Sequence, residues 1–203
     1  KIRPAITRLL QTQMKNDDLS LRYGRSRSNS KNDIVINPSI LVNTISKTNL
    51  DRDEVMIGTV VHEAIHASNN YFIDSESLND LFPDELDDVE DVDDVLEILT
   101  GPFGKYVFDI LIHSIEEKIF VKQYEGLNSI LEDIYTESFS EIKKLGNFSQ
   151  YLSLLFHSIT SYIDPEFENY KKPVISSLNE SLHILKTLSY EDVNVSELIE
   201  ATV

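Results

Sequence analysis

An H-E-x-x-H sequence at residues 62–66 constrains the fold of this chain more than any other feature, because its chemistry requires a helix. At 3.6 residues per turn, His62 and His66 lie one above the other, about 40° apart, so both imidazoles can reach one metal ion. Glu63 falls about 100° further round, where its carboxylate would reach a water on the metal rather than the metal itself. The motif is typical of zinc hydrolases.

A helix is predicted from about Asp53 to Ser68. Asp51 is a natural N-cap and Glu54 follows three residues later, as in a capping box, and Asn69-Asn70 is the predicted stop. The two histidines fall roughly opposite the predicted apolar face and should line a cleft; the alternative interpretation is a surface helix with two solvated histidines. The predicted core face comprises Ile57, Val61, Ala64, Ile65 and Ser68, with Val60 and Ala67 at its edge.

Composition limits the type of metal site and the type of partner. The chain has 203 residues, 41% of them apolar, and no cysteine, so any metal must use His and carboxylate ligands. A formal net charge of −17 argues against a nucleic-acid partner for this acidic protein. A basic run at 22–27 is interpreted as a solvated loop, with contact to an acidic partner as the alternative.

No stretch approaches eighteen uninterrupted apolar residues and no secretory signal opens the chain, so we expect a soluble, cytoplasmic protein without a membrane partner. The chain begins with Lys1 rather than Met, which is typical of a fragment or a processed form.

The overall pattern predicts an α/β (α+β) fold that is mostly helical. A short helix at 5–15 precedes two strands, at 19–23 and 34–36, which should pack on the apolar face of the H-E-x-x-H helix. A small N-terminal sheet and a helical C-terminal lobe are therefore expected, as domains 1–125 and 126–203, with an acidic insertion at about 74–97. Further helices are predicted at 105–122, after a break at 101–104, and at 127–145, 148–163 and 173–188.

A catalytic zinc site needs a third protein ligand. The pattern of the metzincins is excluded because Asn69 and Phe72 stand where that class needs Gly and His or Asp. A glutamate from the 105–122 helix is the alternative. Glu117 points directly away from that helix's predicted apolar face, whereas Glu116 lies on its flank in a strip with His113. Glu116 is the preferred ligand, and Glu117 and His113 are alternative ligands or partners that hydrogen-bond to the ligands. The other interpretation of His113 is a histidine on the helix surface. The predicted apolar face comprises Phe108, Leu111, Ile112, Ile115 and Ile119.

Residues 33–41, 60–66 and 113–119 together resemble the minimal zincin domain of the predicted metallopeptidases associated with von Willebrand factor A domains, a family with phage-encoded relatives. The shared features are a strand ending in Asn37-Pro38, the H-E-x-x-H, and a later helix with an N-x-x-E-[D/E] pattern. The resemblance implies that Glu116 is the third ligand and that Glu117 is the following acid. His113 stands where the family pattern has Asn.

The predicted function is therefore that of a gluzincin-type, zincin-like metallopeptidase, in which Zn²⁺ is held by His62, His66 and Glu116 and Glu63 is the general base. The expected partners are a protein or peptide substrate and a von Willebrand A-type or other assembly partner; a phage origin would imply a virion-associated protein. Two alternatives remain: a zinc amidase that acts on a substrate other than a peptide, with the same three ligands, and a catalytically inactive zincin-fold interaction module within a larger assembly. A closed site that adds His113 as a fourth ligand would favour that module.

Overall fold

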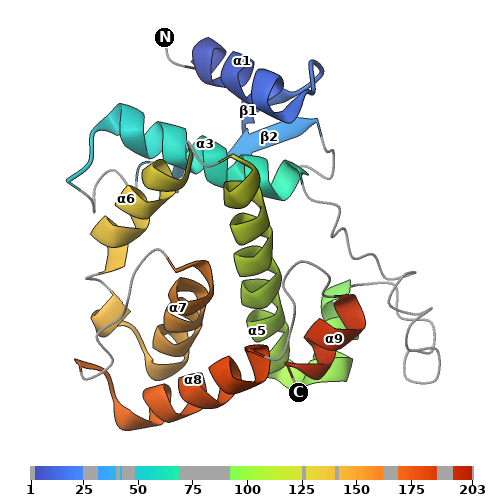
Figure 1. Ribbon diagram of the computed structural model, residues 1–203, viewed down its shortest axis with the longest axis vertical. Helices are drawn as coiled ribbons and strands as arrows, with labels where there is room; N and C mark the ends of the chain where they lie inside the picture. Colours follow the sequence, from blue (N-terminus) through green and yellow to red (C-terminus); the bar gives the residue numbers. More distant parts are fainter. Residues whose placement is uncertain are drawn as a thin grey trace. The chain divides into compact units, whose positions relative to one another are not determined.

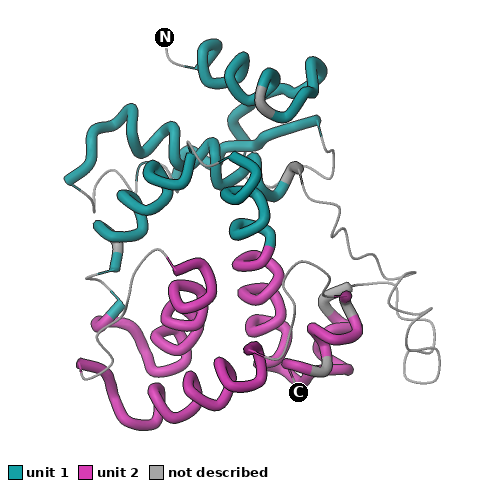
Figure 2. Tube along the Cα trace, in the orientation of Figure 1, with its two compact units in different colours: residues 1–69, 116–142 teal, residues 70–115, 143–203 magenta. Residues whose placement is uncertain are grey.

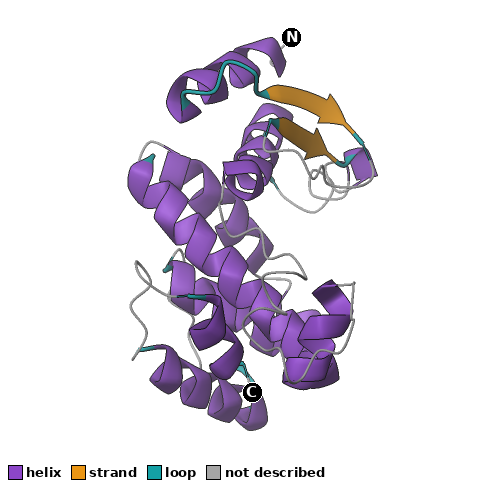
Figure 3. Ribbon diagram, turned by 90° about the vertical axis from the view of Figure 1, so that its right-hand side faces the viewer, coloured by secondary structure: helices purple, strands orange, loops and turns teal. Residues whose placement is uncertain are grey.

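The protein is mostly helical and carries one small sheet (Figures 1 and 3). The computed structural model describes residues 3–24, 32–39, 42, 49–68, 92–124, 127–139, 142–161, 169–186 and 194–202. The described elements are α1 (Arg3–Met14), β1 (Ser20–Tyr23), β2 (Asp33–Ile36), α3 (Arg52–Ser68), α5 (Val92–Gln123), α6 (Asn128–Phe139), the 3₁₀ helix η2 (Ile142–Lys144), α7 (Asn147–Thr160), α8 (Lys172–Leu185) and α9 (Val195–Glu200).

The chain divides into two compact units (Figure 2). Unit 1 comprises residues 1–69 and 116–142, and unit 2 comprises residues 70–115 and 143–203. Helix α6 packs on α3 and belongs to unit 1, whereas α5 contributes residues to both units. The predicted domains, 1–125 and 126–203, stay a prediction.

In unit 1, β1 and β2 form a two-stranded parallel sheet in which Leu21 pairs with Ile34. Ile34, Val35 and Ile36 are all buried. Because successive side chains of a strand point to opposite faces, β2 is covered on both faces. Helix α3 packs against β2, and α1 packs against both α3 and β1. The predicted pair of strands is confirmed, and so is the packing of the second strand on the H-E-x-x-H helix.

Helix α3 begins where the sequence predicts. The backbone N–H of Asp51 donates to the Glu54 carboxylate at 2.8 Å, and the backbone N–H of Asp53 donates to the Asp51 carboxylate at 2.7 Å. Both bonds satisfy donors that the first turn of a helix leaves unpaired. The last residue of the helix is Ser68, and the predicted stop at 69–70 lies outside the described residues.

The buried face of α3 differs from the prediction at its N-terminal end. Ile57 is only half-buried, while Val55 and Met56 are buried, so the core face is rotated there by about one residue. Four residues predicted on the core face or at its edge are buried: Val60, Val61, Ala64 and Ile65.

Helix α5 contains the predicted break as a kink. Gly101 has φ 77° and ψ 173°, and Pro102 follows it within the same helix. Helical residues begin earlier than predicted, at Val92, so part of the expected acidic insertion is helical; residues 74–91 lie outside the described residues. Of the predicted apolar face, Phe108, Leu111 and Ile115 are buried and the other two members are half-buried.

In unit 2, α7 packs against α8 with Leu154, Leu155, Leu178 and Leu185 buried. Both helices match predicted ones, and Pro173 lies in the first turn of α8. The helix predicted at 127–145 is divided into α6 and η2. Helix α9 was not predicted, although its capping box of Asn194 and Glu197 is a recognisable start signal. None of the described helices is long and apolar enough to cross a bilayer.

Candidate metal centre

The two histidines of α3 lie side by side on the same flank of the helix. Their ring centroids are 5.1 Å apart and the ring planes are inclined at 81°. The side chain of His62 is 26% exposed and that of His66 is 15% exposed. Both imidazoles therefore stand at the margin between packed core and solvent, where an open metal site must lie. Glu63, next to His62, is also half-buried.

Two adjacent carboxylates of α5 face these imidazoles. Oε2 of Glu116 lies 3.6 Å from Nδ1 of His66, and Oε2 of Glu117 lies 3.7 Å from Nδ1 of His62. Glu116 is 6% exposed and Glu117 is 0% exposed. Each histidine of the motif therefore has one buried carboxylate beside its Nδ1.

The predicted position of Glu117, opposite the apolar face of its helix, would expose it to solvent. In the structure Glu117 is instead fully buried. The reason is that the side chain of Tyr135, on α6, reaches this side of α5. The hydroxyl of Tyr135 on α6 donates to Oε2 of Glu117 at 2.9 Å and lies 3.1 Å from Nδ1 of His62. Tyr135 was not among the predicted site residues. No local pattern marks it, since its two partners are 18 and 73 residues away in the chain.

Helices α6 and α3 approach each other closely at Gly58, one turn before His62. A Cβ at residue 58 would overlap Cδ1 of Ile134 and would lie 3.5 Å from Cγ2 of Ile130. Tyr135 follows Ile134 directly. The absence of a side chain at Gly58 leaves room for this approach, and the Tyr135 hydroxyl reaches Nδ1 of His62 on α3.

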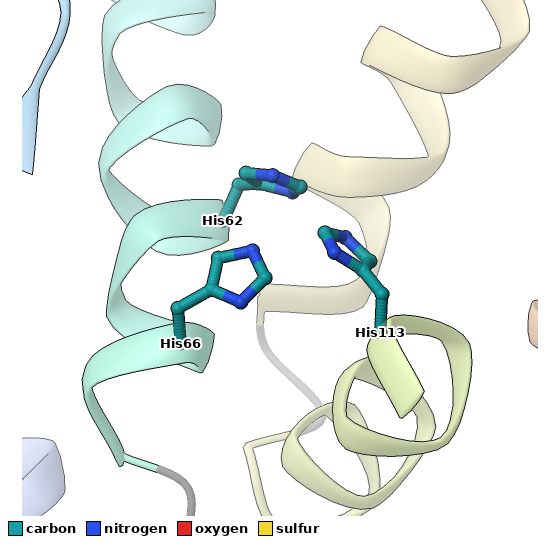
Figure 4. A group of neighbouring side chains, drawn as sticks. All are labelled: His62, His66 and His113. Carbon is teal, nitrogen blue, oxygen red and sulfur yellow. The ribbon is translucent and has the colours of Figure 1, made fainter. Parts of the chain in front are cut away.

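A third histidine joins the pair. His62, His66 and His113 each offer a ring nitrogen, and these nitrogens lie within 4.8 Å of one another (Figure 4). His113 lies on α5, three residues before Glu116 and four before Glu117, so all three belong to one face of that helix. The His113 ring also meets Phe156 of α7 edge-on, with 5.6 Å between centroids.

The donors present suit a zinc ion. Zinc in proteins takes imidazole nitrogen, carboxylate oxygen and thiolate sulfur, and this chain, which has no cysteine, offers the first two here. Buried carboxylates next to imidazoles are also the outer partners that fix metal-binding histidines elsewhere. Of the predicted site residues, the structure thus gathers His62, His66, Glu116, Glu117 and His113, with Glu63 adjoining in the chain.

Comparison of the chain with protein-family models, with curated proteins and with solved structures returns no match. The functional assignment therefore depends on the site itself.

Proposed function

We propose that this protein is a zinc-dependent metallopeptidase with a zincin-like domain. One observation carries the proposal: both imidazoles of an H-E-x-x-H helix face buried carboxylates of a second helix, at 3.6 and 3.7 Å. The H-E-x-x-H spacing alone occurs by chance on surface helices. Its combination with buried acidic side chains at the same place is the arrangement that a His₂Glu zinc site requires.

The burial of the carboxylates supports a cation at this site. Transfer of an ionised carboxylate out of water costs several kcal/mol unless a cation or good hydrogen bonds compensate for it. Glu116 and Glu117 are consecutive and both almost fully enclosed. A divalent ion beside them would offset the repulsion between two neighbouring negative charges as well as the cost of their burial.

The two carboxylates have different proposed roles. Oε2 of Glu117 already accepts the Tyr135 hydroxyl, and Glu117 is completely enclosed. Glu116 retains slight exposure beside His66, whose side chain is itself at the margin of the core. We therefore assign Glu116, with His62 and His66, to the metal. His113 is the alternative donor from α5, because its ring nitrogen is grouped with those of the other two histidines.

Glu63 is the proposed general base. A zinc ion held by these residues supplies a Lewis acid that lowers the pKa of a bound water to about 7 and polarises the scissile carbonyl. The Glu63 carboxylate takes one proton of the attacking water while the water oxygen bonds to the carbonyl carbon. It then delivers that proton to the amide nitrogen as the C–N bond breaks, leaving a carboxylate and an amine. The substrate of this reaction is a protein or peptide.

A second candidate function has one observation in its favour. The three-histidine group, together with Glu116, offers four donors, and a site with four protein ligands has no open position for a substrate. Such a closed centre would fit a catalytically inactive zincin-fold module that acts within a larger assembly, for example with a von Willebrand A-type partner. The two functions differ in whether Glu63 has any chemical role.

The substitution Glu63→Gln separates the two functions. The amide keeps the shape of the side chain but cannot accept a proton, so zinc content should be unchanged while peptide cleavage falls by about 10²- to 10⁴-fold. Cleavage is measured by mass spectrometry on a peptide library, with zinc content measured on the same samples. Glu132→Gln, an exposed position on α6, is the matched control and should leave both unchanged. A zinc-loaded parent that cleaves no peptide, or a Glu63→Gln variant as active as the parent, would contradict the peptidase assignment.

A further inference from the structure

Tyr135 stands between a carboxylate and a metal-site histidine. Its hydroxyl donates to Oε2 of Glu117 at 2.9 Å and is 3.1 Å from Nδ1 of His62, whereas Glu117 and His62 themselves are 3.7 Å apart. Both hydroxyl distances are within hydrogen-bonding range, and the direct distance between the carboxylate and the imidazole is not. The hydroxyl is therefore the link through which Glu117 acts on His62.

The direction of the two hydrogen bonds follows from counting protons. A phenol has a single O–H, and an ionised carboxylate can only accept. The proton of Tyr135 is directed to Glu117, so toward His62 the hydroxyl oxygen presents a lone pair. A hydrogen bond between that oxygen and Nδ1 of His62 then requires the hydrogen on the imidazole nitrogen. In a neutral imidazole, a hydrogen on Nδ1 leaves the lone pair on Nε2.

We propose that Tyr135, backed by Glu117, is a positioning residue that fixes His62 as the Nδ1–H tautomer and so keeps the Nε2 lone pair available for the metal. The inference rests on the proposed function for the role of Nε2, but the proton arrangement belongs to the metal-free protein and can be measured there. It assigns Glu117 to the orientation of His62 rather than to the metal.

Packing holds the link in place. Glu117 is fully buried, so its carboxylate makes this contact inside the protein, where hydrogen bonds to charged groups are stronger than in water. Tyr135 is half-buried and lies on the part of α6 that Gly58 allows to approach α3. His66 is arranged differently, because Glu116 lies directly beside its Nδ1 at 3.6 Å. The proposal therefore concerns His62, and Glu116 stays assigned to the metal.

Nitrogen NMR of the metal-free protein tests the proposal. Protein labelled with ¹⁵N-histidine is recorded at about pH 8, above the ordinary histidine pKa, and long-range ¹H–¹⁵N correlations identify which ring nitrogen of each histidine carries hydrogen. In the parent, His62 should be protonated at Nδ1 and not at Nε2. In Tyr135→Phe, this preference should be lost and the Kd for zinc should rise by roughly 10- to 100-fold, as is usual when an outer partner of a metal-binding histidine is removed.

Tyr151→Phe is the matched control, because the Tyr151 hydroxyl is also hydrogen-bonded within the protein, to Ser181 Oγ at 2.8 Å. It should change neither the tautomer of His62 nor the zinc affinity. A purely structural role for Tyr135 would lower stability without changing the tautomer in the folded protein.

A parent protein in which His62 carries its hydrogen on Nε2 would overturn the proposal. This measurement is made on the parent alone, so it does not depend on whether any variant folds. Unchanged tautomer and zinc affinity in Tyr135→Phe would overturn it as well. A parent that has the Nδ1–H tautomer but binds no zinc would support the proton arrangement and contradict the proposed function, so the two failures are distinguishable.

Discussion

Gly58 of α3 and Ile134 of α6 lie so close together that a Cβ at residue 58 would overlap Cδ1 of the isoleucine. This contact lies between the two helices one turn before His62 and one residue before Tyr135. A glycine inside a helix normally costs about 1 kcal/mol relative to alanine. Here the glycine leaves room for the Ile134 side chain on the helix that carries Tyr135.

A double-mutant cycle tests this contact. Gly58→Ala should destabilise the protein by about 1–3 kcal/mol, because the added methyl displaces Ile134, despite the gain in helix propensity. With Ile134→Ala present, the same methyl enters the space that the isoleucine vacates. We therefore expect a coupling free energy of about 0.5–3 kcal/mol from urea unfolding of the two single variants and the double variant. Strictly additive effects would mean that α6 does not depend on Gly58.

The two carboxylates of α5 should differ in their effect on zinc affinity. Glu116→Gln removes the proposed anionic ligand. The Kd of this variant for zinc should therefore rise by more than the roughly 10- to 100-fold that is typical when a residue hydrogen-bonded to a metal ligand is removed. Glu117→Gln should cost no more than that range, because the amide oxygen can still accept the Tyr135 hydroxyl. Competition titration with a fluorescent chelator measures both. The reverse order would make Glu117 the ligand, and a larger loss in His113→Asn than in Glu116→Gln would make His113 the third ligand.

Removal of the metal should leave the fold intact. Unit 1 has a buried apolar core that includes Val60, Ile65 and Leu131, and the burial of this apolar surface stabilises the fold whether or not a metal is bound. Far-ultraviolet circular dichroism should therefore be nearly the same before and after chelation, with a lower Tm that reflects only the lost binding free energy. Cooperative loss of helix on chelation would instead identify a structural metal and favour the closed-site module.

Gly101 should tolerate substitution poorly for a purely local reason. Its φ of 77° and ψ of 173° belong to a region that is essentially restricted to glycine, and a Cβ there would meet nothing within 4 Å. Gly101→Ala should lower the free energy of unfolding by about 1–3 kcal/mol. Gly146→Ala is the comparison, since Gly146 also has open space around it but has φ −65°; as the N-cap of α7 it should lose only the preference of that position for glycine over alanine, less than about 1 kcal/mol. Equal effects of the two substitutions in thermal unfolding would show that the conformation at Gly101 is not the cause.

The sequence predicts those parts of the site that depend on local signals. The start of α3 is marked by Asp51 and Glu54, and the spacing of His62 and His66 on one helix follows from helical geometry alone. The break at Gly101 is likewise marked by its Gly-Pro sequence. These features involve residues close together in the chain, for which propensity and periodicity are informative.

The features of the site that the sequence does not predict depend on packing between segments that are far apart in the chain. The sequence predicts Glu117 on the solvent-facing side of its helix, because the periodicity of apolar residues identifies only one buried face. It gives no information on whether another part of the chain packs against the opposite face. The side chain of Tyr135, 18 residues further along the chain, hydrogen-bonds to Glu117 on that face. The half-burial of Ile57 has the same origin, since the contacts of α3 with β2 and α6 determine which side chains are enclosed.

The most direct test of the metal site is zinc K-edge X-ray absorption on the protein loaded with one equivalent of zinc. Nitrogen and oxygen donors are expected at about 2.0–2.2 Å, with the outer-shell scattering of at least two imidazoles. In a variant that combines His62→Ala with His66→Ala, this signal should disappear or fall to that of the single imidazole of His113. A zinc ion surrounded by oxygen donors alone, or an imidazole signal that is unchanged in the double variant, would contradict the proposed site.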